Sequence, residues 1–450
     1  MQIIYDIAKP FDKLLKKQKV IAGEQYRPMH YVVEQPVDKG LLLYHTMTKA
    51  LLLLTPKEGE MYKTNPTALP QLVEEWFLVP QSHDDRLLSR QIRDLARMLK
   101  KKTDAITGYT IMTTTDCNAR CFYCYEMGRP RIPMSPDMAL QTADYIISHC
   151  QGKKVSIEWF GGEPLYNKPV ITLICQRLTD ANIEYTSTMV TNGYLFNADT
   201  IKEAKENWFL KEVQITLDGT EKIYNRSKAY IYKGINAYRR VIDNIHLLQE
   251  AGINVCIRIN IDMHNVDNLS ELTDELRREF CNSKRISVYV HPLIEAVNGS
   301  QALHHDQQRK FVFDKMDEIE SKLMDYGFFR ANRLSHRIKT HHCMADNDNS
   351  IVIAPDGRIG KCEHYTDNHF VGHIKDLNLD KQMKDSFLET YDEISACATC
   401  FNYPNCIWLK LCQGKTHCYE EDRHHDIAKL RQSILRAYQE KYKDKHQYEI

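Results

Sequence analysis

The chain has no net charge and no long hydrophobic run. It carries 60 Lys and Arg residues against 60 Asp and Glu residues, so no excess of charge favours nucleic acid or an acidic membrane. None of its apolar runs approaches the ~20 residues that span a bilayer. Its first residues lack a basic region followed by an apolar signal core. These absences predict a cytoplasmic protein that binds neither nucleic acid nor a membrane.

Cysteine, in contrast, is plentiful. Fourteen cysteines in a reducing compartment favour metal binding or catalysis over a disulfide framework. Ten of them fall in two groups, within residues 117–124 and 343–418. The other four lie in helix-like or strand-like segments and are expected to be buried structural thiols: Cys150, Cys175, Cys256 and Cys281.

The first group, Cys117, Cys121 and Cys124, has the spacing Cys-x3-Cys-x2-Cys directly after a strand-like run, 108–112. A loop at a strand end can place three thiolates around one 4Fe–4S cluster, which leaves the fourth iron open for another ligand. The alternative is a zinc site, which requires a fourth Cys or His nearby, and none follows within about twenty residues. We therefore expect an iron–sulfur cluster here.

Between residues 107 and 291, strand-like segments alternate with helical patterns, the clearest being Met138–Cys150, Ala237–Gln249 and Leu269–Phe280. Strands joined by helices pair in parallel through right-handed crossovers, and ligands bind at the carboxyl ends of such strands. Six strands are predicted: Tyr109–Thr113, Val155–Phe160, Glu184–Val190, Glu212–Leu217, Ile253–Ile261 and Ile286–Val290.

Polar and glycine-rich motifs stand on these strands, mostly at their ends, beginning with Gly-Gly-Glu-Pro at 161–164. Together with the cysteine spacing and the aromatic residue before the third cysteine, they resemble the radical S-adenosylmethionine (SAM) enzymes. In that family the amino and carboxylate groups of SAM bind the open iron. The resemblance implies a partial (β/α)6 barrel and SAM contacts from Tyr123, Gly161, Gly162, Glu163, Thr191, Asn192, Asp218, Arg258 and Asn260.

One motif departs from the family pattern. Relatives often show His-Asp-x-x-Arg after the fourth strand, and its Arg helps to bind the SAM carboxylate. The corresponding run here is Tyr224-Asn-Arg-Ser-Lys228. The resemblance then implies that either Arg226 or Lys228 takes that role.

The C-terminal region carries the second cysteine group, which begins at Cys343, and a predicted hairpin, 351–362, follows and presents Cys362. Its Cys-x2-Cys-x5-Cys core resembles the SPASM domain, which holds two auxiliary 4Fe–4S clusters; a zinc-binding tail is the alternative. The resemblance assigns Cys397, Cys400, Cys406 and Cys418 to the outer cluster and Cys343, Cys362 and Cys412 to the inner one. No eighth cysteine completes the inner site, which leaves an open iron or a ligand such as His341, His342 or Asp346.

The N-terminal region has three predicted strands, within 30–55, and then three predicted helices, 57–62, 69–76 and 85–100. This content resembles the winged-helix recognition module of peptide-modifying enzymes, which binds a leader peptide as an added strand. A plain cap on the next domain is the alternative. The expected domains are therefore 1–103 (winged-helix-like), 104–292 (barrel), 293–340 (bridge) and 341–450 (SPASM).

The resemblance implies three 4Fe–4S clusters, SAM as cofactor, and a flavodoxin or ferredoxin as electron donor. The expected activity is radical maturation of a ribosomally made precursor peptide by oxidative cross-linking, with its leader bound by the N-terminal domain. Two alternatives stand beside it: an anaerobic sulfatase maturase that forms formylglycine, and a non-catalytic metal-binding redox sensor. The long segment before Cys117 argues against the first, and the set of SAM-site motifs argues against the second.

Overall fold

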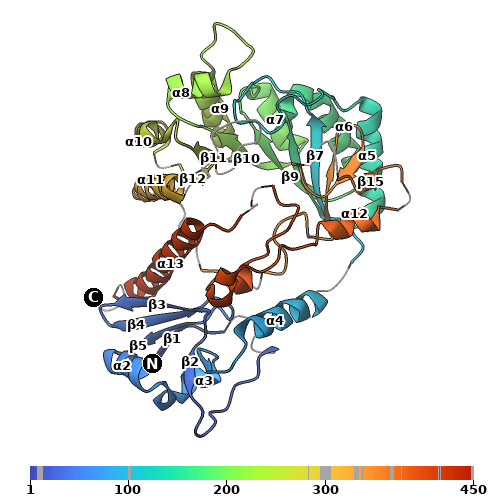
Figure 1. Cartoon of the computed structure of the whole chain (residues 1–450). Coiled ribbons are helices and arrows are strands. Elements are labelled where there is room, and N and C mark those ends of the chain that lie inside the picture. The colour runs from blue at the N-terminus through green and yellow to red at the C-terminus, as the bar shows by residue number, and fades with distance from the viewer. Residues whose placement is uncertain are drawn as a thin grey trace.

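The computed structural model describes residues 1–7, 14–99, 103–281, 283–293, 306–328, 334–335, 339–364, 369–376, 378–413, 415 and 417–446. In Figure 1 a small N-terminal sheet lies at the bottom and a larger sheet flanked by helices lies at the top. A C-terminal segment runs between them and ends in the long helix α13 (Glu420–His446).

The larger sheet has the strand order β12-β11-β10-β9-β8-β7-β13-β14-β15. Its strands β7 to β12 are parallel throughout. They overlap the six predicted strands, so the expected α/β class with a parallel sheet is confirmed. Their bounds are β7 (Gly108–Thr114), β8 (Val155–Gly161), β9 (Tyr185–Thr191), β10 (Leu210–Thr216), β11 (Asn254–Ile261) and β12 (Ile286–Pro292).

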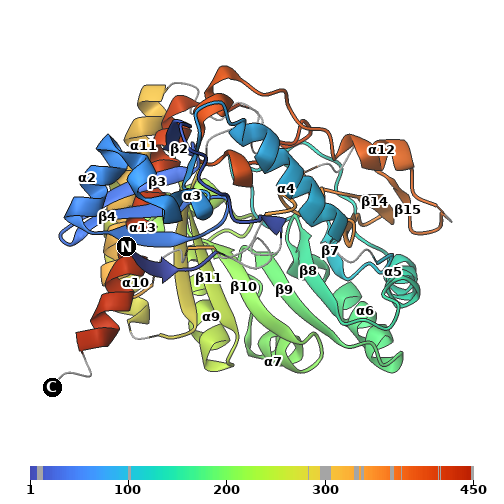
Figure 2. The ribbon, with the colours of Figure 1, turned by 90° about the horizontal axis from the view of Figure 1, so that it is seen from below.

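Helices cover one side of this sheet (Figure 2), while the N-terminal elements and the C-terminal segment lie on the other. Local signals start several of them: the Ser135 side chain accepts from the Met138 amide at the start of α5, with Pro136 in the first turn. The helices are α5 (Pro136–His149), α6 (Lys168–Asp180), α7 (Ala198–Glu206), α8 (Glu221–Lys228), α9 (Ala237–Glu250), α10 (Leu269–Phe280) and α11 (Asp306–Asp325), with short 3-10 turns η2 (Pro164–Asn167) and η3 (Val266–Asn268).

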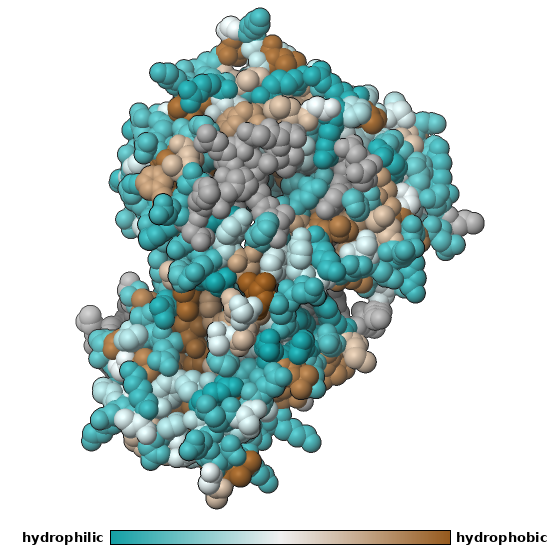
Figure 3. All heavy atoms as spheres, viewed as in Figure 1, coloured by the Kyte–Doolittle hydropathy of each residue, from teal (hydrophilic) through white to brown (hydrophobic). Residues whose placement is uncertain are grey.

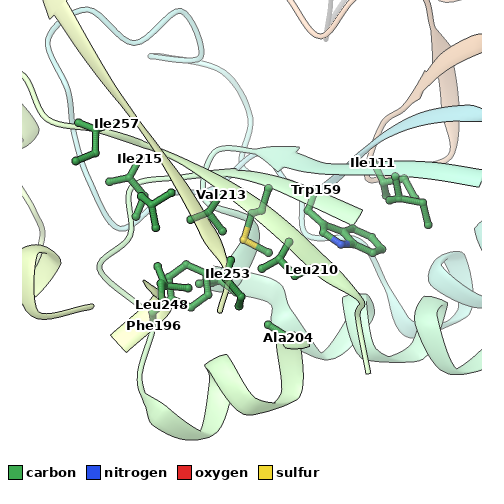
Figure 4. Close-up of a cluster of buried hydrophobic side chains, with 14 of the residues drawn as sticks. Ile111, Trp159, Phe196, Ala204, Leu210, Val213, Ile215, Leu248, Ile253 and Ile257 are labelled. Carbon is green, nitrogen blue, oxygen red and sulfur yellow. The ribbon is translucent and has the colours of Figure 1, made fainter. Parts of the chain in front are cut away.

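The core lies between the sheet and these helices. Alternate strand residues such as Trp159, Val213 and Ile257 are fully buried and meet helix residues such as Ala204 and Leu248 (Figure 4). Because successive side chains of a strand point to opposite faces, the residues between them point to the inner face of the sheet. That face is polar, as described below.

The C-terminal region enters the same sheet. The predicted hairpin is confirmed as β13 (Ser350–Ile353) and β14 (Arg358–Gly360), which pair antiparallel. β13 also pairs in parallel with β7, so residues 350–353 lie directly beside the strand that leads into the first cysteine group. The remaining elements of this region are β15 (Gly372–His373), α12 (Lys381–Ser386), η4 (Ser395–Thr399) and η5 (Tyr403–Asn405).

The N-terminal part contains a four-stranded antiparallel sheet of order β1-β5-β4-β3 and a two-stranded sheet, β2-β6. The predicted strands and helices of this region are present, while β1, β2 and β6 were not predicted. A Thr55–Glu58 capping box starts α2. The bounds are β1 (Gln2–Tyr5), β2 (Tyr26–Pro28), β3 (Val32–Val37), β4 (Gly40–His45), β5 (Leu51–Leu54), β6 (Leu78–Pro80), α2 (Pro56–Thr64), η1 (Pro66–Ala68), α3 (Pro70–Glu74) and α4 (Asp85–Leu99).

Both ends of the chain pack together. Ile434, Ala437 and Tyr438 of α13 are buried against one face of the N-terminal sheet. The turn between β4 and β5 also holds the segment around the outer cysteines, because the Lys49 ammonium donates to Asn405 Oδ1 at 2.6 Å. From α4, Arg93 donates to the carbonyl of Cys406 at 2.9 Å.

His45 organises the turn that makes these contacts. Its Nδ1 accepts hydrogen bonds from the amides of Met47 (3.3 Å) and Thr48 (3.4 Å), so the ring proton is on Nε2, which donates to the Trp76 carbonyl at 3.1 Å. The ring is fully buried, and this burial lowers the pKa of His45 from its usual 6.5 to about 4.

Acid is therefore expected to loosen this turn. Between pH 6.5 and about 4 the unfolded chain binds a proton at His45 and the folded chain does not, so stability falls as the pH drops through that window. The free energy of unfolding falls by about 3 kcal/mol across this window. Hydrogen exchange of residues 41–54 between pH 7 and pH 4 measures it. The His45→Gln variant does not titrate, and the same pH dependence in that variant would contradict the prediction.

Hydrophilic side chains cover most of the face shown in Figure 3, and the apolar residues on it form separate groups. Among the described residues, no helix is both long and apolar enough to cross a membrane. Of the four scattered cysteines, Cys150 and Cys175 are buried as predicted and Cys256 is half-buried. The prediction is wrong for Cys281, which follows the last residue of α10 and is exposed.

Candidate active site at the carboxyl ends of the strands

The first cysteine group forms a loop at the carboxyl end of β7. Burial raises the pKa of Cys117 to about 12 and that of Cys124 to about 11, and the neighbouring thiols add to each rise. The sulfur of Cys117 accepts a hydrogen bond from the amide of Ala119 at 3.3 Å. Burial favours the neutral form of a thiol, and a bound metal ion stabilises the thiolate form instead.

The two glycines of the Gly-Gly-Glu-Pro motif pack against the start of this loop. A Cβ on Gly161 would lie 2.2 Å from the carbonyl oxygen of Thr114, and one on Gly162 would lie 2.3 Å from that of Asp116. The amides of Gly162 and Glu163 donate to the same two carbonyls, each at 3.0 Å. Both glycines are therefore required for β8 to meet the cysteine loop, whatever ligand binds there.

Glu163 joins two strand ends. Its carboxylate is fully buried and accepts from the Thr191 hydroxyl (2.8 Å), the Asn192 amide (2.8 Å) and the Leu165 amide (3.1 Å). Burial raises its pKa to about 7, and these hydrogen bonds lower it in part. With its oxygens used in this way, Glu163 positions the end of β9.

Asn192 continues from β9 to the cysteines. Its side-chain amide donates to Asn118 Oδ1 at 2.6 Å and lies 3.8 Å from the sulfur of Cys117. The predicted residues Glu163, Thr191 and Asn192 thus form one continuous network with the loop that carries Cys117.

A buried ion pair lies on the other side of the loop. Lys228 Nζ is 3.0 Å from Asp218 Oδ2 and 2.6 Å from the hydroxyl of Tyr123, which itself donates to Asp218. Lys228 and Asp218 are only 3% and 2% exposed. Arg226, in contrast, is exposed on α8. Of the two residues predicted for the SAM carboxylate, the structure therefore places Lys228 in the site and Arg226 outside it.

Arg258 and Asn260 lie on β11, where Arg258 Nε donates to Asn260 Oδ1 at 2.8 Å. The Asn260 amide in turn donates to Asp218 Oδ1 at 3.3 Å, which ties β11 to the ion pair. Except for Arg226, the predicted SAM contacts therefore lie on the strands, the cysteine loop and the end of α8 that surround the first cysteine group.

The inner face of the sheet carries polar residues that were not predicted as part of the site. Thr110 donates to Glu158 at 3.3 Å, and Tyr289 donates to Gln214 at 2.8 Å. Their signal in the sequence is polar residues alternating with the apolar core positions of each strand. Burial raises the pKa of Glu158, and the nearby carboxylate of Glu363 raises it further.

The three cysteines expected to form the inner group come from distant parts of the sequence and lie close together. Burial raises the pKa of Cys362, and Glu363, Cys343 and Cys412 all contribute to the rise, so the three thiols are neighbours. Asp346 is committed elsewhere: its carboxylate accepts from the amides of His342 (2.8 Å) and Cys343 (3.0 Å). Asp346 therefore shapes the Cys343 turn and is a poor candidate for the missing ligand.

The outer group is also assembled. Burial raises the pKa of Cys400, and the neighbouring thiols of Cys406, Cys418 and Cys397 add to the rise. Cationic side chains approach its sulfurs: Lys415 lies 3.9 Å from Cys406, and Arg423 lies 3.5 Å from Cys418. Such donors stabilise thiolates and tune iron–sulfur clusters.

Within the described residues, no three His, Cys, Asp or Glu side chains converge to hold a single metal ion. A 4Fe–4S cluster makes no such demand, since each thiolate binds a separate iron. The three groups of neighbouring thiols, with N–H donors directed at sulfurs in each, fit such clusters.

Comparison with known proteins agrees with this chemistry. Residues 111–278 match the profile of the Radical SAM superfamily. The Fe-coproporphyrin III synthase of Methanosarcina barkeri is 26% identical over 48% of this chain and 52% of that enzyme. The cysteine-type anaerobic sulfatase-maturating enzyme of Clostridium novyi is 22% identical over 67% of this chain and 85% of the enzyme. The radical SAM cyclopropyl synthase TigE of Paramaledivibacter caminithermalis is 22% identical over 48% of each. The chain thus spans about half the length of the first and third of these relatives.

Solved structures share the fold. Native anSMEcpe with bound AdoMet and Cp18Cys peptide matches with a TM-score of 0.56 at 14% identity, over 74% of this chain and 96% of that one. Streptococcus suis SuiB matches with a TM-score of 0.51 at 14% identity, over 84% and 94%. Residues 111–278 thus carry the profile of the Radical SAM superfamily, as the cysteine spacing predicts, and the solved structures share the fold.

Proposed function

We propose that this chain is a radical SAM enzyme that modifies a ribosomally made precursor peptide by oxidative cross-linking, forming a thioether, carbon–carbon or ether bond. SAM would supply a 5′-deoxyadenosyl radical that removes hydrogen from the peptide. Cys117, Cys121 and Cys124 would hold the SAM-binding cluster, and the other two groups would hold auxiliary clusters that accept the second electron. A flavodoxin or ferredoxin would supply the first.

The observation that carries this proposal is the closeness of the first cysteine loop to the inner cysteine group. Tyr125, next to Cys124, and His364, two residues beyond Cys362, have ring centroids 4.5 Å apart. Glu363 is close both to the inner cysteines and to Glu158 on the inner face of the sheet: after burial, its carboxylate is the largest cause of the raised pKa of Cys362 and of Glu158. A substrate on that face would contact both the first cysteine loop and the inner cysteine group. A two-electron oxidation requires both, one for hydrogen removal and one to accept the second electron.

The N-terminal part is proposed to bind the leader of that peptide. Its sheet ends in β3, which pairs on one side with β4 and with no other strand among the described residues. An edge strand offers backbone groups to an added strand. This role also fits the resemblance to winged-helix modules, although the same part holds the outer cysteine segment and so acts as a structural support too.

Formylglycine formation is the second candidate, favoured by the likeness to the Clostridium novyi enzyme and to anSMEcpe. The Cp18Cys peptide, which is bound in an anSMEcpe structure, provides a direct probe of it.

The test uses anaerobically reconstituted full-length protein with SAM and dithionite. We expect about twelve irons per chain and formation of 5′-deoxyadenosine. The Cp18Cys peptide should remain unchanged, whereas short peptides encoded beside the enzyme should lose a pair of hydrogen atoms per cross-link upon co-expression. If the Cp18Cys thiol is converted to an aldehyde, formylglycine formation becomes the supported activity and the cross-linking proposal is rejected. Zinc in place of iron, with no SAM cleavage, would reject both.

A further inference from the structure

The buried pair Lys228–Asp218 is not explained by folding stability. A buried ion pair must recover the loss of solvation of both ions, and replacing such a pair with apolar residues is often neutral or stabilising. Here the three polar groups of Lys228, Asp218 and Tyr123 bond mainly to one another in a site that is almost closed to solvent. The ion pair is therefore expected to serve the site that surrounds it.

That site is the first cysteine loop. Tyr123 lies between Cys121 and Cys124 in the sequence, and its ring centroid is 5.2 Å from Lys228 Nζ. The backbone makes a second connection, because the Arg120 amide donates to the Lys228 carbonyl at 2.8 Å and the Ile231 amide donates to the Asn118 carbonyl at 2.9 Å. The end of α8 is thus fastened along the loop.

Both charges of the pair lie beside the middle of this loop. Tyr123, two residues after Cys121, bonds to each of them: its hydroxyl donates to Asp218 and accepts from Lys228 Nζ at 2.6 Å.

We infer that the Lys228–Asp218 pair sets the balance of charge beside Cys121 and thereby tunes the reduction potential of the iron–sulfur cluster held by this loop. Reduction adds one electron to the cluster, so a neighbouring cation stabilises the reduced form and a neighbouring anion destabilises it. In the test that electron comes from dithionite. The inference rests on the proposed assignment of Cys117, Cys121 and Cys124 as cluster ligands. Lys228 and Asp218 would act on that cluster through their charges without binding it.

The experiment is a potentiometric titration followed by electron paramagnetic resonance on reconstituted full-length protein. The signal of this cluster is recognised by its change when SAM is added and by its absence after substitution of the three cysteines. Four variants are compared with the wild type: Lys228→Met, Asp218→Asn, the double variant, and Lys222→Met as a control. Lys222 is exposed on the same helix.

Lys228→Met leaves the carboxylate uncompensated, so the equilibrium constant for cluster reduction should fall at least tenfold, which is 59 mV for one electron. Asp218→Asn leaves the ammonium uncompensated and should raise that constant by a similar factor. The double variant and Lys222→Met should lie near the wild type. Circular dichroism and iron content verify that each variant folds and carries its cluster.

Single variants that keep the wild-type potential, or that shift it in the same direction, overturn the inference. If a single variant loses its cluster, the double variant tests the inference, because it leaves no unpaired buried charge. A double variant that also fails to carry a cluster would show that the pair acts only on the folding of the loop. A wild-type protein that binds no iron through the three cysteines would instead contradict the proposed function.

Discussion

Replacing Cys117, Cys121 and Cys124 together with alanine is expected to remove about four irons per chain and to abolish SAM cleavage. These half-buried thiols are neighbours at the carboxyl end of β7, joined to the SAM-type residues of β9 through Asn118 and Asn192. No other cysteine in the described chain is placed to replace them in that loop. Iron analysis and chromatography of 5′-deoxyadenosine measure the two effects.

Cys281→Ala is the matched control, because that thiol is exposed and follows α10, outside the three cysteine groups. It should keep its iron and its SAM cleavage. Retention of SAM cleavage in the triple variant would show that the reaction does not use this loop, whereas loss of all the iron would show that the three sites assemble together.

Alanine at Gly162 is expected to disable the same site without removing a ligand. Its Cβ would lie 2.3 Å from the Asp116 carbonyl oxygen and 2.7 Å from the Asp116 carbonyl carbon. Both are backbone atoms that cannot rotate away, so β8 must separate from the cysteine loop. We expect a loss of about 2–4 kcal/mol in stability and no SAM cleavage, measured by thermal unfolding and by turnover.

Gly152→Ala separates the clash from the general effect of replacing a glycine. Gly152 has a φ of +68° and no atom within 4 Å of an added Cβ. It should therefore lose only about 1 kcal/mol through backbone strain and keep its SAM cleavage. Equal losses in the two variants would mean that the contact between Gly162 and Asp116 does not hold the site together.

The sequence predicts the barrel well because each of its strands carries a local signal. Runs such as 155–160 alternate apolar and polar residues between helical segments, and the motifs at their ends meet because parallel strands end at one edge of the sheet. The grouping of seven C-terminal cysteines came from resemblance to a family, and the structure brings the predicted members of each group together.

What the sequence could not predict depends on contacts between distant segments. Nothing within residues 350–353 indicates that β13 pairs with β7, because strand pairing is not written in the local pattern. The same holds for the choice of Lys228 over Arg226. Both stand at the end of α8, and only the packing of that helix decides which side chain meets Asp218. The sequence likewise gives no sign that the Asp346 carboxylate accepts from the amides of its own turn, so Asp346 stands among the predicted ligands.

The position of β13 has a consequence for how the enzyme is made. β7 is a central strand only when residues 350–353 have joined it, and the N-terminal sheet has one face uncovered until α13 packs there. Domains generally fold in order as they leave the ribosome. Here the N-terminal sheet and β7 depend on segments that come much later in the sequence, so the fold closes only after α13 has been synthesised. Iron delivered earlier would meet cysteines without their final neighbours, and we expect nascent chains truncated before residue 350 to be substrates for chaperones and proteases instead of partly active enzymes.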